Sequence, residues 1–82
     1  SADGPPVELR VYPNPATDYI QLNNNNMVQL ISVYNLAGRQ VKNFVYANHE
    51  RYFIGDLPKG MYLVQLIGKS NERIATRRLH IR

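Results

Sequence analysis

The chain has 82 residues and no cysteine, which allows one domain with one core and excludes disulfides and thiolate metal sites. Its formal net charge is +4, yet the basic residues are scattered singly except near the C-terminus, so charge-protected strand edges explain them better than a nucleic-acid interface. No run reaches the roughly 18 apolar residues of a membrane-spanning helix, and residues 1–6 resemble a linker rather than an export signal, so we expect the chain to be part of a longer protein.

Alternating apolar and polar residues predict an all-β domain of seven short strands, because no window keeps apolar residues at helical spacing. The pattern begins with Val7, Leu9 and Val11, which alternate with polar neighbours. In chain order the predicted strands are residues 7–11, 20–22, 28–36, 39–46, 52–54, 61–67 and 73–81. In the later strands the side chains predicted to face the core are Ile31, Val33, Tyr62, Val64, Leu66, Leu79 and Ile81.

Two connections contain proline at the position where a type I turn requires its fixed φ. In Asn14-Pro15-Ala16-Thr17, Pro15 takes that position and Asn14 is expected to cap the turn. Leu57-Pro58-Lys59-Gly60 repeats the pattern, with Gly60 at the closing position. We therefore expect a type I turn in each segment.

Other connections are predicted from glycine and asparagine. Residues 36–39 indicate a short hairpin loop in which Gly38 takes the left-handed conformation of a bulge. Residues 68–71 indicate a second hairpin, and residues 23–26 a polar loop. Short strands separated by turns about every 8–12 residues, without a crossover helix, predict a seven-stranded antiparallel immunoglobulin-like β-sandwich.

The polar residues form no catalytic or metal-binding motif. The serines lie in no nucleophile motif with a histidine, and His49 and His80 stand on separate segments without the close pairing of metal ligands. The glycines are dispersed, so there is no loop that would cradle a phosphate. We therefore predict no enzyme activity, no catalytic residue, no metal and no cofactor.

The aromatic residues allow two interpretations. Six tyrosines and two phenylalanines either pack inside the sandwich or form a platform for a carbohydrate or a peptide. Tyr62, just after the segment 57–61, is typical of a tyrosine corner, in which the ring fills the core and the hydroxyl holds the preceding connection.

Four segments, in this order, resemble the type IX secretion C-terminal sorting domain of the Bacteroidetes. They are Val11-Tyr12-Pro13-Asn14-Pro15-Ala16-Thr17-Asp18, Ile31-Ser32-Val33-Tyr34-Asn35-Leu36-Ala37-Gly38-Arg39-Gln40-Val41, Leu57-Pro58-Lys59-Gly60-Met61-Tyr62-Leu63-Val64 and the basic-apolar C-terminus. Their motif residues are Pro13, Asn14, Pro15, Gly38, Gly60 and Tyr62. The resemblance implies a sorting domain over residues 7–82, preceded by a linker over residues 1–6.

This resemblance implies a non-enzymatic signal at the end of a larger cargo protein. The cargo would cross the periplasm and then the outer membrane through the type IX translocon, to reach the outer membrane surface or the extracellular space. The implied partners are the translocon and sortase-like proteins, with cleavage in residues 1–6 and an indirect link to anionic lipopolysaccharide. The alternative is a retained fibronectin-like or carbohydrate-binding surface module that uses the aromatic residues.

The C-terminal segment, residues 73–82, alternates cationic and apolar side chains. If it forms a sheet edge, its backbone can pair with a strand of the translocon or of a second copy. The residues expected to form this recognition element are Arg77, Arg78, Leu79, Ile81 and Arg82. The two apolar residues would hold the strand to the core, and the guanidinium groups suit bidentate carboxylate partners. Alternatively, the arginines only protect the edge against aggregation.

Overall fold

The computed structural model describes residues 9–23 and 27–82, and these residues contain seven strands and no helix. The strands are β1 (Val11–Tyr12), β2 (Tyr19–Leu22), β3 (Val28–Asn35), β4 (Gln40–Val45), β5 (Tyr52–Phe53), β6 (Gly60–Gly68) and β7 (Arg73–Ile81). The predicted all-β class and strand order are confirmed. The predicted first strand, residues 7–11, overlaps β1 only at Val11: Leu9 and Arg10 precede the strand, and Val7 and Glu8 lie outside the described residues.

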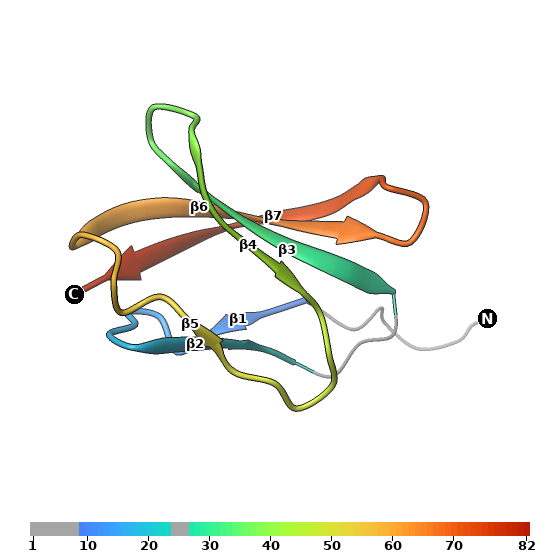
Figure 1. The fold of residues 1–82 in the computed structure, drawn as a ribbon, viewed down its shortest axis with the longest axis horizontal. Helices are drawn as coiled ribbons and strands as arrows, with labels where there is room; N and C mark the ends of the chain where they lie inside the picture. Colours follow the sequence, from blue (N-terminus) through green and yellow to red (C-terminus); the bar gives the residue numbers. More distant parts are fainter. Residues whose placement is uncertain (1–8, 24–26) are drawn as a thin grey trace.

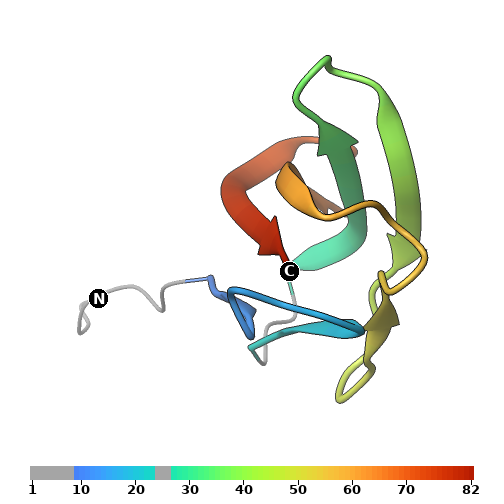
Figure 2. The ribbon, with the colours of Figure 1, turned by 90° about the vertical axis from the view of Figure 1, so that its left-hand side faces the viewer.

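The strands form two antiparallel sheets that face each other (Figure 1). One sheet has the order β1-β2-β5 and the other the order β4-β3-β6-β7. Figure 2 shows the four-stranded sheet arching over the three-stranded one. Antiparallel strands divided between two packed layers make the predicted immunoglobulin-like sandwich.

The core lies between the sheets and takes its side chains from alternate strand positions. The seven side chains predicted to face the core in the later strands are all buried there. The most completely buried large side chains are Ile20, Ile31, Ile54, Leu66, Leu79, Ile81, Val33 and Val64. Burying each one contributes roughly 1.5–3 kcal/mol. A shift of one residue in the pairing would turn a whole strand's apolar set to solvent, so this burial also fixes the register.

The two predicted hairpins share one geometry. In the first, Gly38 N donates to Asn35 O at 3.0 Å, Asn35 N donates to Arg39 O at 2.9 Å, and Gly38 has φ +87°. In the second, Asn71 N donates to Gly68 O at 3.0 Å and Asn71 has φ +65°. Glycine and asparagine tolerate this left-handed conformation best, so the sequence signal for both loops is confirmed.

The connection before β6 forms a tyrosine corner, as predicted. The ring of Tyr62 is buried, and its hydroxyl donates to the carbonyl of Pro58. The predicted turn over residues 57–60 is wrong, however, because the hydrogen-bonded turn closes three residues earlier, with Leu57 N donating to Ile54 O at 3.1 Å. Gly60 starts β6 with φ +147°, a conformation that side chains disfavour.

The segment before β1 is fixed to the end of β2 by reciprocal hydrogen bonds. Arg10 N donates to Asn23 Oδ1 at 2.9 Å, and Asn23 N donates to Arg10 O at 3.1 Å. Leu9 is buried beside this pair. Asn23, the first residue of the predicted polar loop, therefore holds the segment before β1 in place. The other residues of that loop, 24–26, lie outside the described residues.

Candidate functional site

The chain changes sheets just after β1. β1 pairs with β2, but Ala16 then forms a parallel bridge with Ile81 at the end of β7. The peptide bonds before Pro13 and Pro15 are both cis. Residues 13–15 form a bend and Ala16 forms the bridge, so the type I turn predicted over residues 14–17 is not seen. The Asn14 side chain expected to cap it, and the backbone of Ala16, are used elsewhere.

Those groups bind the outer edge of β7. Asn14 Nδ2 donates to Arg78 O at 3.0 Å, and His80 N donates to Asn14 Oδ1 at 2.9 Å. Ala16 N donates to His80 O at 2.8 Å, and Arg82 N donates to Ala16 O at 2.8 Å. We call this segment the Asn14–Ala16 clasp. It pairs with alternate residues of β7, which is how a neighbouring strand would bind the same edge.

The clasp changes the expectation for the C-terminal strand. β7 lies at the edge of its sheet, as predicted, but its edge is already paired from the carbonyl of Arg78 to the amide of Arg82. The expectation of an edge open to strand addition therefore fails over this half of β7. The physical reason is the parallel bridge at Ala16, which closes the edge from within the domain.

The side chains of the strand divide between two faces. Leu79 and Ile81 lie in the core, with exposed fractions of 0% and 2%, whereas Arg78, His80 and Arg82 are exposed. Because side chains alternate along a strand, these three exposed groups lie on the same side of the sheet. The buried pair fixes the position of the exposed row.

Arg77 is used inside the domain. Its Nε donates to Leu9 O at 2.7 Å and its Nη1 to Thr76 O at 2.9 Å. The side chain is half-buried and connects β7 to the segment before β1. Arg77 therefore differs from Arg78 and Arg82, although the sequence pattern groups the three together.

A groove of about 320 Å³ lies between these two segments, lined by Leu9, Arg10, Val11, Asn14, Arg77 and Arg78. Three of the six lining residues are arginines and none is acidic. Guanidinium groups suit carboxylates, which they bind through two parallel hydrogen bonds. Sequence reasoning missed Arg10, since nothing in the local pattern at residue 10 connects it to the C-terminal strand.

Elsewhere in the domain, two side chains have a pKa that differs from its ordinary value. Lys42 Nζ lies 2.9 Å from Asp56 Oδ1, and its hydrogen bond holds the pKa of that carboxyl below the ordinary value. Burial raises the pKa of the Tyr52 hydroxyl, which donates to Ala47 O and accepts from Ala47 N. Both contacts join residues on or next to β4 and β5, and neither involves β7.

The aromatic residues are divided between the core and the surface. Tyr52 and Tyr62 are buried, whereas Tyr12, Tyr19 and Phe53 are 43–46% exposed. Register places the exposed three on the outer face of the three-stranded sheet, where the Tyr19 and Phe53 rings meet edge to face at 5.8 Å. Some aromatic side chains therefore pack inside the sandwich, and others gather on its outer face.

Metal ligands do not gather in residues 9–23 and 27–82, where no group of three or more histidine, cysteine, aspartate or glutamate side chains is placed to hold an ion. In the same residues no helix is long and apolar enough to span a membrane.

The profile of the secretion system C-terminal sorting domain family matches residues 10–82. Comparison with curated proteins and with solved structures found no match. The match contains β1 to β7, the clasp and all three arginines of the groove. The chain therefore belongs to the family of type IX secretion C-terminal sorting domains.

Proposed function

We propose that the type IX translocon recognises this domain through the exposed arginine side chains of β7, which the Asn14–Ala16 clasp holds in place. The family supports a sorting-signal role and an interaction with the secretion machinery. The observation that carries the residue-level proposal is the clasp itself, which fixes Arg78, His80 and Arg82 in one exposed row.

Side-chain recognition fits this geometry better than strand addition. The backbone of Arg78, His80 and Arg82 is already bonded to the clasp, so a partner meets their side chains first. The arginine-lined groove with Arg10 lies beside the row and would accept further carboxylates. The partner surface is thus expected to be acidic. Arg77 serves in this proposal mainly to hold β7 against Leu9.

The family resemblance also supports two later steps. A sortase-like peptidase would cut in residues 1–6, and the cargo would then be joined to anionic lipopolysaccharide on the cell surface. Gly4-Pro5-Pro6 has the composition of an exposed linker. The C-terminal mass of the exported cargo tests this: a product ending in residues 1–6 supports the cut, and a full-length product excludes it.

A retained binding module is the second candidate, and one observation favours it. The exposed aromatic side chains Tyr12, Tyr19 and Phe53 gather on one sheet face, as a carbohydrate platform requires. The two candidates differ in whether the domain confers export when transplanted.

The decisive experiment fuses the domain to a reporter with an N-terminal signal peptide, in a host that has type IX secretion. The wild-type fusion is expected at the cell surface or in the medium, and a fusion lacking residues 79–82 in the periplasm. Because that deletion removes Leu79 and Ile81 from the core, R78E/R82E provides the second variant. Its matched control, R51E/K59E, makes the same charge change at two exposed residues that belong neither to β7 nor to the lining of the groove.

R78E/R82E should remain folded yet lose most of its export, while the control should be exported like the wild type. A wild-type fusion that stays in the periplasm would exclude the sorting role. Export of R78E/R82E at the wild-type level would exclude recognition through Arg78 and Arg82.

A further inference from the structure

The outer face of the four-stranded sheet has an uncharged centre. Its central strands, β3 with 8 residues and β6 with 9, contain no charged residue. The core takes Ile31, Val33, Val64 and Leu66 from these strands, so the side chains between them face away from the other sheet. Register places the outward side chains in cross-strand rows: Leu30 with Val45 and Ile67, Ser32 with Asn43 and Gln65, and Tyr34 with Leu63. We call these eight residues the uncharged face.

The uncharged face has the composition of an interface centre. Charged residues make up 20% of the chain, and none lies in these rows. Val45 is 72% exposed, although it stands directly opposite the apolar Leu30. Depletion of charge at the centre, with a charged rim, distinguishes protein interfaces from ordinary surface.

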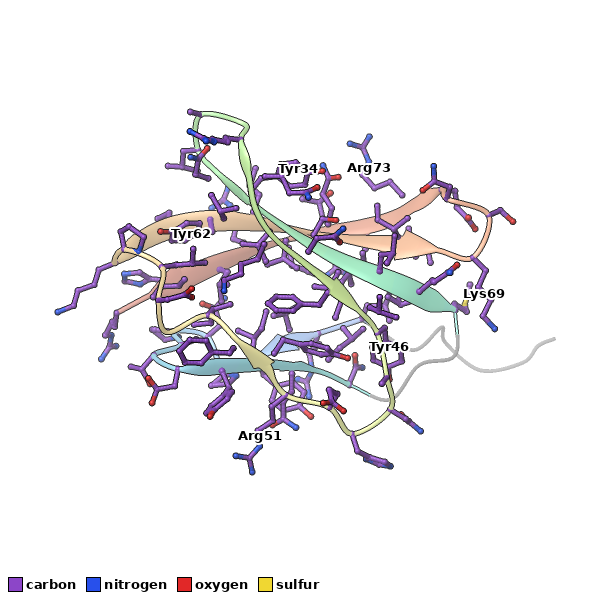
Figure 3. All side chains as sticks on the ribbon, viewed as in Figure 1. Tyr34, Tyr46, Arg51, Tyr62, Lys69 and Arg73 are labelled. Atoms are coloured by element: carbon purple, nitrogen blue, oxygen red, sulfur yellow. The ribbon has the colours of Figure 1, made fainter. Side chains whose placement is uncertain are left out.

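The rim of this face is basic. Arg78 stands opposite Leu63 in the register and is exposed. Arg73, at the other end of β7, lies with Tyr34 on the side of the sheet that faces away from the three-stranded sheet (Figure 3). Exposed Arg39 is in the hairpin that joins β3 and β4. The nearby acidic side chain, Glu72, accepts a hydrogen bond from Ser70 N within its own hairpin.

We propose that the uncharged face docks a protein of the secretion machinery whose contact surface has an uncharged centre and carboxylates at its rim. This inference rests on the proposed function and extends it from the C-terminal row to the whole sheet. Charge complementarity selects the occupant, because opposite potentials across an interface favour encounter and like charges oppose it. A second copy would bring the two basic rims together, so it fits this face poorly.

The size of the face indicates a transient contact. Three strands about 4.8 Å apart, each contributing some 20 Å of length, cover roughly 300 Å², which is below the area of a stable complex.

The test places one charge in the centre and reverses one at the rim, in the same reporter fusion. Q65E and R73E act on the uncharged face and its rim. Their matched controls are Q21E and R51E, at residues of the opposite sheet and the loop beside it. Q65E/R73E should lower export about tenfold or more, because Q65E places a charge against the partner's uncharged centre and R73E sets a like charge against the carboxylates of its rim. Q21E/R51E should change export by less than about twofold, as exposed charges usually do.

The sign of the charge gives a second readout. At the rim, R73K keeps the positive charge that would meet the partner's carboxylates, so R73K should retain several times more export than R73E. Equal loss in both would overturn the charge argument. If Q65E unfolds on its own, R73E carries the test, because Arg73 is exposed.

The remaining outcomes separate the two proposals. Export of Q65E/R73E at the control level, with normal export of the wild type, overturns docking on this face and leaves the sorting role intact. A wild-type fusion that is not exported overturns both. A concentration-dependent dimer of the purified domain in sedimentation, abolished by V45E but not by Q21E, would assign the face to a second copy and overturn the proposed occupant.

Discussion

Asn14 Oδ1 accepts a hydrogen bond from His80 N at 2.9 Å, across 66 residues of sequence. The same side chain donates to Arg78 O, so one amide binds a donor and an acceptor on the edge of β7. This relationship connects the motif after β1 to the C-terminal strand, which is the element that we propose the translocon recognises.

Replacement of Asn14 by alanine should loosen the C-terminal strand. N14A removes two side-chain hydrogen bonds at an exposed edge, so we expect a loss of about 1–2 kcal/mol in the free energy of unfolding. Hydrogen exchange at His80 N should also accelerate. N48A, which removes an exposed acceptor from the loop after β4, is the control and should change neither quantity appreciably. Unchanged exchange at His80 N in N14A would contradict the role of the clasp.

Tyr62 should contribute through both its ring and its hydroxyl. Y62A removes a buried aromatic ring and should destabilise the domain by roughly 3–5 kcal/mol. Y62F keeps the ring and loses only the bond to the carbonyl of Pro58, so its cost should be about 0.5–1.5 kcal/mol. Denaturant unfolding measures both values, with Y19F at an exposed tyrosine as the control. Equal stability of Y62A and the wild type would exclude the tyrosine corner.

Gly60 and Asn71 should respond in opposite directions to substitution. Gly60 has φ +147°, and no atom lies within 4 Å of the point that a Cβ would occupy, so G60V is expected to lose about 1–3 kcal/mol through backbone strain rather than collision. Asn71 has φ +65°, which glycine adopts without cost, so N71G should be neutral or slightly stabilising. The melting temperatures of G60V and N71G measure both effects. A G60V domain as stable as the wild type would contradict the predicted backbone strain at Gly60.

The buried hydroxyl of Tyr52 should make the domain sensitive to alkali. Burial raises its pKa in the folded state above the ordinary value. The stabilising contribution is therefore fully present below the unfolded pKa of about 10 and is lost as the pH rises through the folded pKa. Y52F should show a shallower fall in melting temperature above about pH 10, whereas Y12F, at an exposed tyrosine, should follow the wild type. Parallel curves for Y52F and the wild type would contradict this linkage.

The strands could be predicted because their signal is local. Alternation in β6 and β7 directly indicates the buried side chains Tyr62, Val64, Leu66, Leu79 and Ile81, and glycine or asparagine identifies the two hairpins. The turn before β6 is misplaced in the prediction because Pro58 matches a type I turn by composition, while the hydrogen bond forms between Ile54 and Leu57.

The clasp could not be predicted, because no local pattern connects Asn14 with His80. The same limit applies to Arg10, which the fold brings beside Arg77 and Arg78. The separation of Arg77 from Arg78 is different: adjacent residues of a strand face opposite sides, so alternation already contained that signal. Only the bond from Arg77 to Leu9 O required the structure.

A graded series at Arg78 and Arg82 measures most directly whether the translocon recognises these side chains. The initial rate of export is compared for the wild type, R78K/R82K, R78Q/R82Q and R78E/R82E fusions, all folded by melting temperature. Recognition of the guanidinium groups by carboxylates predicts a decreasing order from arginine through lysine and glutamine to glutamate, since lysine keeps the charge and loses the bidentate geometry. Equal rates across the four fusions would contradict recognition through this row.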